Sequence, residues 1–284
     1  MTKDYTLNPR SIKYHVNKFL VENSHRIKEK KVIDVPAGNG VTSGILKKLG
    51  AHPVPFDLFP QLFDIPGIEC QFADASKGIP VEDESADWLI CQEGIEHFSD
   101  QHEVLKEFSR VVKKNGTLVI TTPNHSNLRS KLSYMIGESE RFTSQMPPNE
   151  ADSIWMSDQS MSGGLYFGHV YLIGIQRLRL FARLAGFTIK DIRFTRLKST
   201  SAILFPFWYP FILLFNSFVF YKNIRKLKGN TRDFRYRVYK ESFKLSINPK
   251  ILVDGHLFVE FVKTESHQDI LKSLGTIHIK GGIT

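Results

Sequence analysis

The ten residues 31–40, KVIDVPAGNG, decide the fold class of this chain. A short apolar run ends at Asp34, two glycines follow at Gly38 and Gly40, and residues 41–49 then have helical spacing. A strand that turns into a helix through glycines brings backbone and free helix N–H groups close to a bound ligand. The stretch therefore predicts a ligand-binding strand–turn–helix unit within an α/β fold.

Further short strands alternate with helices along the chain. We expect strands at residues 54–57, 68–72, 86–91, 117–121, 187–194 and 256–262, and helices at 11–29, 41–49, 101–112, 127–136 and 176–184. The helix at 101–112 should end in a C-cap at residues 113–116. Such alternation indicates βαβ units and a mainly parallel sheet.

The composition excludes several classes of protein. Of 284 residues, 42% are hydrophobic and 24% are charged, which rules out a disordered chain, a collagen and a coiled-coil rod. The two cysteines, Cys70 and Cys91, form no CxxC pair, so we expect no metal site. Lone cysteines and a polar segment at residues 1–10, without a secretory signal, favour the cytoplasm.

The order acid-x-x-x-Gly-x-Gly, formed by Asp34, Gly38 and Gly40, resembles motif I of the class I S-adenosylmethionine-dependent methyltransferases. The NAD fingerprint GxGxxG would need a glycine where the chain has Ser43, which disfavours an NAD-dependent oxidoreductase. One departure from the family is Pro36, at the position of the first motif-I glycine.

Downstream segments also resemble this family, in the same order. They are Asp57 at a strand end and residues 72–75, 87–98, 108–118, 121–124, 168–170 and 185–187. The resemblance covers about residues 30–196. It implies a Rossmann-like, seven-stranded, mostly parallel sheet with an antiparallel last strand and helices on both faces.

The resemblance also implies S-adenosylmethionine as the cofactor. Asp34 would hold its amino group, directly or through water, Asp57 its ribose hydroxyls, and the segment around Asp74 its adenine. The expected cofactor-binding residues are Asp34, Pro36, Ala37, Gly38, Gly40, Asp57, Asp74, Ala75 and Gln92. Two alternatives stay open: Asp34 could merely cap the next helix, and Asp57 could be a solvated loop acid.

A base is needed if the acceptor is a hydroxyl or a weakly acidic carbon. Our catalytic candidates are His97, His169 and Glu93, with His125 and Glu96 as further alternatives. His97 ranks first because it follows the fourth strand, and the crevice of an open α/β sheet lies at the carboxyl ends of its strands. A purely structural role for His97 is the competing interpretation.

Residues 202–221 contain no charge, and nine of the twenty are aromatic. The length would just cross a bilayer as a helix. Because Pro206 and Pro210 should break that helix, we expect a bent hairpin that dips into a membrane interface. The alternatives are a buried core or oligomer contact and a true membrane span.

Residues 222–244 carry nine Lys or Arg against two acids, which accounts for +7 of the net charge of +9. Anionic lipid attracts such a segment, so residues 202–244 predict a membrane-surface partner. An RNA methyltransferase could instead use Arg232, Arg235, Tyr236, Arg237 and Tyr239. That rival is disfavoured because Gln-Glu-Gly-Ile stands at 92–95, where base-methylating relatives have Asn/Asp-Pro-Pro-Tyr.

These patterns predict five parts of the chain. They are a helical cap (1–30), a methyltransferase core (31–196 and 250–264), an acceptor-site insertion (124–170), an apolar hairpin with a basic segment (200–249) and a tail (265–284). The predicted function is methyl transfer to a small, hydrophobic or lipid-linked acceptor at the cytoplasmic face of a membrane. A non-catalytic, cofactor-binding membrane scaffold is the non-enzymatic rival.

Overall fold

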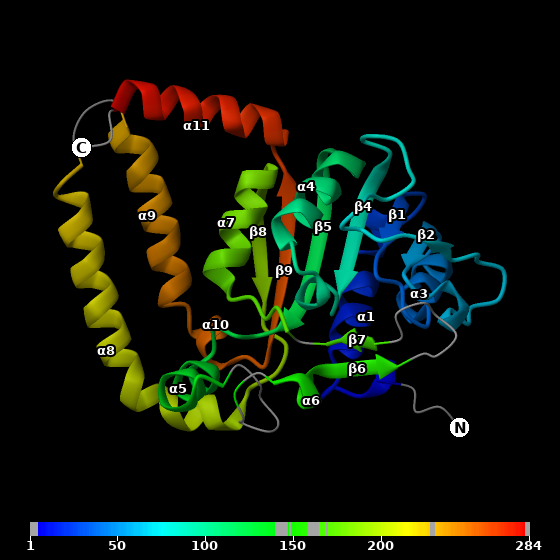
Figure 1. Ribbon diagram of the computed structural model, residues 1–284, viewed down its shortest axis with the longest axis horizontal. Helices are drawn as coiled ribbons and strands as arrows, with labels where there is room; N and C mark the ends of the chain where they lie inside the picture. The colour runs from blue at the N-terminus through cyan, green and yellow to red at the C-terminus, as the bar shows by residue number, and fades with distance from the viewer. Residues whose placement is uncertain are drawn as a thin grey trace.

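A computed structural model describes residues 5–139, 147, 149–157, 165–168, 170–227 and 231–281. Its centre is a seven-stranded sheet with the strand order β3-β2-β1-β4-β5-β9-β8 (Figure 1). The strands are β1 Lys31–Asp34, β2 His52–Asp57, β3 Gln71–Phe72, β4 Ala86–Gln92, β5 Val112–Pro123, β8 Phe187–Arg193 and β9 His256–Lys263. Only β9 runs against its neighbours, β5 and β8, so the predicted mostly parallel sheet is confirmed.

Helices cover both faces of this sheet. The longer ones are α1 Ile12–Glu22, α3 Val41–Lys48, α4 Gln101–Val111, α5 Leu128–Gly137, α7 Ile175–Ala185, α8 Ser199–Ile224, α9 Arg232–Ser246 and α11 His267–Gly281. The short ones are η1 Tyr5–Leu7, α2 Ser24–Ile27, η2 Pro60–Leu62, η3 Ile95–His97, α6 Glu150–Ser153 and α10 Pro249–Val253. A separate pair of strands, β6 Ile154–Ser157 and β7 Leu165–Phe167, completes the described elements.

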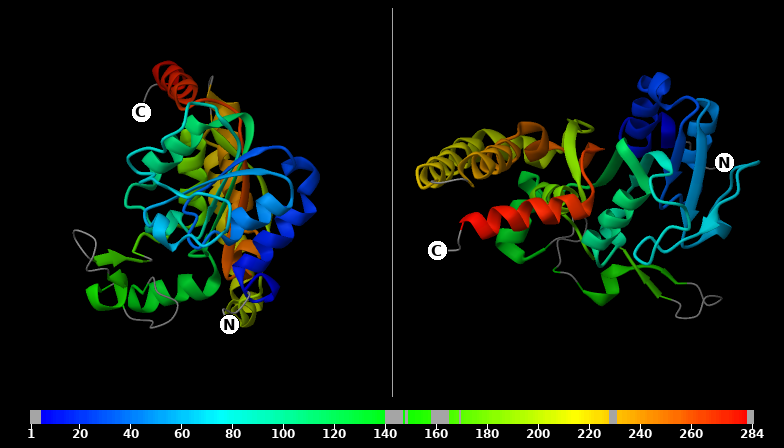
Figure 2. Two further views of the ribbon diagram at one scale, coloured as in Figure 1. Left: turned by 90° about the vertical axis from the view of Figure 1, so that its right-hand side faces the viewer. Right: turned by 90° about the horizontal axis from the view of Figure 1, so that it is seen from above.

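The core is divided by the sheet. Phe19 of α1 and Leu46 of α3 pack with Trp88 on one face, while Phe108 of α4 packs with Leu89 on the other. Figure 2 shows α1 and α4 on opposite sides of the sheet. Neighbouring residues of β4 therefore serve different layers, because successive side chains of a strand point to opposite faces.

Three predicted boundaries need correction. The helix expected at 11–29 is two helices that meet at Asn23, whose side-chain amide donates to the Phe19 carbonyl at 2.9 Å. The helix C-cap expected at residues 113–116 is wrong: Val112 is fully buried and pairs with Ala86, so β5 begins there. The tail expected at 265–284 contains the helix α11, whose Ile270 is buried.

The hairpin predicted within residues 202–221 is also wrong. α8 is one helix of 26 residues that contains Pro206 and Pro210. Each proline lacks an N–H and costs about 3 kcal/mol in a helix interior, so other contacts must offset that cost. The Ser201 hydroxyl accepts from the Arg129 backbone N–H at 3.1 Å near the start of α8, and Phe220 stacks on Phe243 of α9 near its end.

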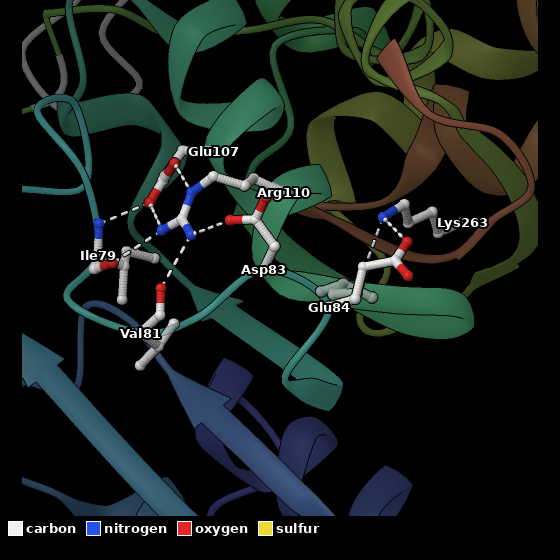
Figure 3. A network of polar contacts seen from close by, with 8 residues as sticks. Ile79, Val81, Asp83, Glu84, Glu107, Arg110 and Lys263 are labelled. Atoms are coloured by element: carbon white, nitrogen blue, oxygen red, sulfur yellow. Dashed lines mark hydrogen bonds and ion pairs between the residues drawn. The ribbon is translucent and has the colours of Figure 1, made fainter. Parts of the chain in front are cut away.

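The edge of the sheet at which β4 begins is held by ion pairs (Figure 3). The Arg110 guanidinium donates to the carbonyls of Ile79 and Val81, both at 2.8 Å, and pairs with Asp83 at 2.7 Å and Glu107 at 2.6 Å. Arg110 therefore ties the loop before β4 to α4, the helix that contains both Arg110 and Glu107. The opposite edge, where the parallel strands end, carries the cavity that is lined by the glycine turn and Asp57.

Candidate active site

A cavity of about 750 Å³ lies at the carboxyl ends of β1, β2 and β4. The strand order reverses between β1 and β4, and a crevice at such a switch point is where open α/β sheets bind ligands. The beginning of α1 covers the cavity, as predicted for the helical cap. The lining residues are Ser11, Ile12, Lys13, Val35, Pro36, Ala37, Gly38, Asn39, Val41, Thr42, Asp57, Leu58, Phe59, Leu62, Ala73, Ala75, Gln92, Glu93, Gly94, His97 and Phe98.

The two glycines of the turn have different roles. Gly38 has a φ of +54°, lines the cavity, and has open space where a Cβ would lie. Gly40 has a φ of +83° and is absent from the lining; a Cβ there would lie 2.6 Å from side-chain atoms of both Ile65 and Phe63. Gly38 thus leaves room for a ligand, whereas Gly40 leaves room for the loop after β2.

Asp57 ends β2 at the cavity wall and is only 6% exposed. Its Oδ2 accepts from the Gly38 N–H at 2.7 Å, and its Oδ1 accepts from the Phe59 N–H at 2.9 Å. A carboxylate oxygen can accept two hydrogen bonds. Each oxygen therefore keeps one acceptor position free for a ligand hydroxyl, so the carboxylate suits a ligand with two adjacent hydroxyls. Leu58 and Leu62 form an apolar part of the cavity wall beside Asp57.

Comparison with known proteins agrees with this geometry. Residues 33–120, which contain the turn, Asp57 and β4, match the methyltransferase-domain family. This part of the chain is thus a methyltransferase domain, and it supports the resemblance to the class I S-adenosylmethionine-dependent enzymes. The match supports S-adenosylmethionine as the cofactor of this domain, and the paired acceptors of Asp57 fit the ribose hydroxyls of that molecule.

Two relatives and one solved structure illustrate the similarity. An uncharacterized methyltransferase-like protein of Schizosaccharomyces pombe is 30% identical over 95 residues, which are 31% of this chain and 36% of the relative. The ubiquinone biosynthesis O-methyltransferase of Aliivibrio fischeri is 25% identical over 142 residues, 47% of this chain and 58% of the relative. The chain thus matches between about a third and three fifths of their lengths.

The solved structure shares the fold. An S-adenosylmethionine-dependent methyltransferase from Archaeoglobus fulgidus superposes with a TM-score of 0.50 and 16% identity, covering 91% of this chain and 98% of the other. This likeness supports the fold alone, which is an α/β, Rossmann-like architecture.

Asp34 does not line the cavity. It is 1% exposed and accepts from the Ser43 hydroxyl at 2.6 Å, so it holds the first turn of α3 beneath the glycine turn. Burial raises its pKa to about 7, and the bonds from Ser43 oppose that rise. This bond to Ser43, in the first turn of α3, agrees with the alternative that Asp34 caps the helix.

The other predicted cofactor residues are placed as follows. Asp74 is not among the lining residues; its Oδ1 accepts from the Ser76 hydroxyl at 2.6 Å, while Ala75 faces the cavity. Gln92 lines the cavity and accepts from the Thr42 hydroxyl at 2.8 Å.

Pro36, the departure from the family pattern, also lines the cavity, as does Ala37. The ring of Pro36 lies against Gly94, where a Cβ would overlap the Cδ of the proline. Gly94 thus provides the space that Pro36 needs, and the substitution is accommodated by a glycine on the neighbouring strand end.

Of the catalytic candidates, His97 and Glu93 line the cavity. His169 lies outside the described residues. His125 follows β5 and is absent from the lining, and its ring packs edge-on against Tyr134. Glu96 is fully buried behind the cavity, where its Oε2 accepts from the Thr122 hydroxyl at 2.9 Å.

Two buried carboxyl groups and a histidine lie together at this point. Burial, and then the neighbouring Glu96, raise the pKa of Glu93 well above its usual range. Burial likewise raises the pKa of Glu96 to about 7. The Oε2 of Glu93 lies 3.5 Å from the Nε2 of His256, and burial, then nearby cations led by Arg196, lower the pKa of His256 to about 4.

His256 was not among the site residues predicted from the sequence. It is the first residue of β9, and because β9 is antiparallel, its beginning lies at the edge where the parallel strands end. An antiparallel last strand was predicted from the sequence. The residue that begins this strand could therefore have been predicted to lie at the cavity edge. Ser11 and Lys13, just before and within α1, were missed for lack of any motif.

Proposed function

We propose that the protein transfers a methyl group to a hydrophobic acceptor that resides in a membrane, and that it works at the cytoplasmic surface of that membrane. The observation that carries this proposal is the apolar face of α8. Six of its side chains are 65–70% exposed: Ile203, Phe207, Phe211, Leu214, Phe215 and Phe218. Exposed apolar patches of this kind mark interaction surfaces.

α8 is suited to lipid by its length as well as its face. Among the described residues it is the one helix long and apolar enough to cross a bilayer, judged by length and composition alone. Twenty-six residues give about 39 Å at 1.5 Å per residue. Its basic companion α9, which lies beside it in Figure 1, makes a surface-lying arrangement the better interpretation, because basic residues remain at the headgroups.

The position of α8 supports delivery of an acceptor to the cavity. β8 ends at the same edge of the sheet as the cavity, and α8 begins six residues later at Ser199. α5 packs beside the start of α8 along the lower edge in Figure 1. Tyr134, Met135 and Ile136 of α5 are 50–76% exposed. Apolar surface therefore continues from α8 onto α5, which belongs to the predicted acceptor-site insertion.

Bound S-adenosylmethionine supplies a methyl group already activated on a positively charged sulfur. The protein must orient the acceptor and, for a hydroxyl, remove its proton. Glu93 faces the cavity, and burial raises its pKa, so its carboxylate is a stronger base than an exposed one. The neutral His256 ring, whose Nε2 lies 3.5 Å from the Oε2 of Glu93, positions this carboxyl group at the cavity wall.

The RNA alternative has weaker support. The ring of Tyr236 lies 6.2 Å from Phe220 of α8, and the Lys240 ammonium lies 5.7 Å from the Tyr236 ring. An aromatic ring used in helix pairing is less available for stacking on bases. The similarity to ubiquinone biosynthesis O-methyltransferases further supports a hydrophobic acceptor.

Liposome flotation tests the membrane part of the proposal. Phe211→Asp with Phe215→Asp should abolish flotation at every salt concentration, because it removes the inserting surface. The control pair, Val21→Asp with Phe72→Asp, changes exposed apolar residues away from α8 and should float like the wild type. A wild-type protein that stays with the soluble fraction on anionic liposomes would overturn the membrane proposal.

Incubation with labelled S-adenosylmethionine and a lipid extract from cells lacking the gene tests the activity. We expect label in the organic phase, and a turnover about 10²–10⁴-fold lower for Glu93→Gln with little change in cofactor affinity. A fully active Glu93→Gln together with an inactive His97→Ala would move the base to His97. Label confined to water-soluble products would contradict a lipid acceptor.

A further inference from the structure

Three basic residues lie near the start of α8. Arg129 belongs to the first turn of α5, and Arg196 and Lys198 belong to the connection from β8 to α8. We name these three residues the basal cation cluster. Arg196 and Lys198 also act electrostatically on His256, the partner of Glu93, so the cluster adjoins the catalytic wall of the cavity.

Arg196 is fixed in place by the backbone. Its Nη1 donates to the Arg10 carbonyl at 2.8 Å, just before the segment that covers the cavity. Its Nη2 lies 3.7 Å from the position that a Cβ on Gly255 would take, so the guanidinium lies over the residue that precedes His256. Within the described ranges, Arg196 has no carboxylate partner.

Lys198 lies next to Arg129 at the start of α8. The Arg129 backbone N–H donates to the Ser201 hydroxyl at 3.1 Å, three residues beyond Lys198. Burial lowers the pKa of Lys198, and the charges of Arg129 and Arg196 lower it further. In the part of the chain that the structure describes, its ammonium has no hydrogen bond and no ion pair. Cations held together in this way favour the binding of an anion.

Asp254, the acid next to this turn, does not pair with the side chain of Arg196. The Oδ1 of Asp254 accepts from the Thr195 hydroxyl at 2.6 Å, and from the backbone N–H groups of Arg196 and His256, both at 3.1 Å. Its Oδ2 accepts from the Thr195 N–H at 2.6 Å. Asp254 is 2% exposed, so its charge is directed into the turn and away from the side chain of Arg196.

We propose that the basal cation cluster binds a phosphate group carried by the lipid acceptor. This inference rests on the proposed function and names the acceptor as an anionic, phosphate-bearing lipid. Guanidinium groups match phosphate oxygens in a fork geometry, and an ammonium adds a point charge.

The spacing along α8 agrees with a lipid source of the phosphate. Lys198 precedes Ile203, the first strongly exposed apolar residue of α8, by five residues, or about 8 Å of helix. In the surface-lying arrangement the cluster therefore lies in the headgroup layer, at the end of the apolar face of α8. A lipid with its phosphate on the cluster then has its acyl chain next to Ile203 and Phe207.

Binding of dodecyl phosphate and of dodecanol, each in neutral detergent micelles, tests this inference by calorimetry. The wild type should bind dodecyl phosphate at least tenfold more tightly than dodecanol. Arg196→Gln with Lys198→Gln should remove that preference. Arg225→Gln with Lys226→Gln, which removes the same charge near the far end of α8, should keep it.

Unchanged cofactor affinity and thermal midpoint in the Arg196/Lys198 variant verify its fold. A preference that survives in this variant would overturn the assignment. So would inorganic phosphate, or a short single-stranded RNA, that competes as well as dodecyl phosphate. Failure of the proposed function is distinguishable, because it appears as a wild type that does not float on liposomes or gives no labelled lipid, whatever the micelle result.

Discussion

Replacement of Asp57 by asparagine should weaken cofactor binding by about 10- to 150-fold. The carboxylate accepts from the N–H groups of Gly38 and Phe59 at 2.7 and 2.9 Å. An amide offers one acceptor oxygen, so one of these N–H groups loses its partner and one ribose hydroxyl loses an acceptor. A hydrogen bond to a charged group contributes about 1.5–3 kcal/mol, and 1.4 kcal/mol is tenfold in affinity.

Calorimetry with S-adenosylmethionine measures the loss. Asp64→Asn is the matched control, because it removes the same charge from an exposed position in the same loop region and should leave the affinity unchanged. Competition by adenosine and by 2′,3′-dideoxyadenosine separates the hydroxyl contact from the shape of the turn. The wild type should prefer adenosine, and Asp57→Asn should reduce that preference.

Two results would refute this reasoning. An affinity of Asp57→Asn within twofold of the wild type would show that the carboxylate neither holds the ligand nor shapes the turn. A weakened variant that keeps the full preference for adenosine would show that Asp57 supports the backbone without contacting the ribose.

Three further predictions concern stability, measured by urea unfolding. Gly40→Ala should cost at least about 2 kcal/mol, because it adds a steric overlap with Ile65 to a strained φ, whereas Gly38→Ala should cost about 1 kcal/mol and mainly weaken cofactor binding. The pKa of Asp34 is raised from 3.8 to about 7, so the folded state loses stability as pH rises through that range; in Asp34→Asn this decline should be smaller by up to about 4 kcal/mol. Arg110→Met should cost about 1–3 kcal/mol, since its guanidinium is a third exposed, with no change in cofactor affinity.

The strand–turn–helix unit and the parallel sheet followed from local pattern. Alternating apolar runs and helical spacing are properties of neighbouring residues, and the acid at the end of β2 marked Asp57 at the cavity. Local pattern failed at β5, where a sequence typical of a helix C-cap begins a strand because Val112 pairs with Ala86. It failed again at α8, where tertiary contacts near both ends keep a helix continuous through two prolines.

The sequence by itself determined the fold class, the cofactor turn and the presence of an apolar segment followed by a basic one. Only the tertiary structure showed that Asp34 supports α3 from beneath, that Gly40 makes room for Ile65, and that His256 reaches Glu93 from a strand more than 160 residues away in the chain. The physical reason is that a side chain's type and local spacing are fixed by sequence, whereas its burial and its partners depend on which strand ends meet at one edge of the sheet.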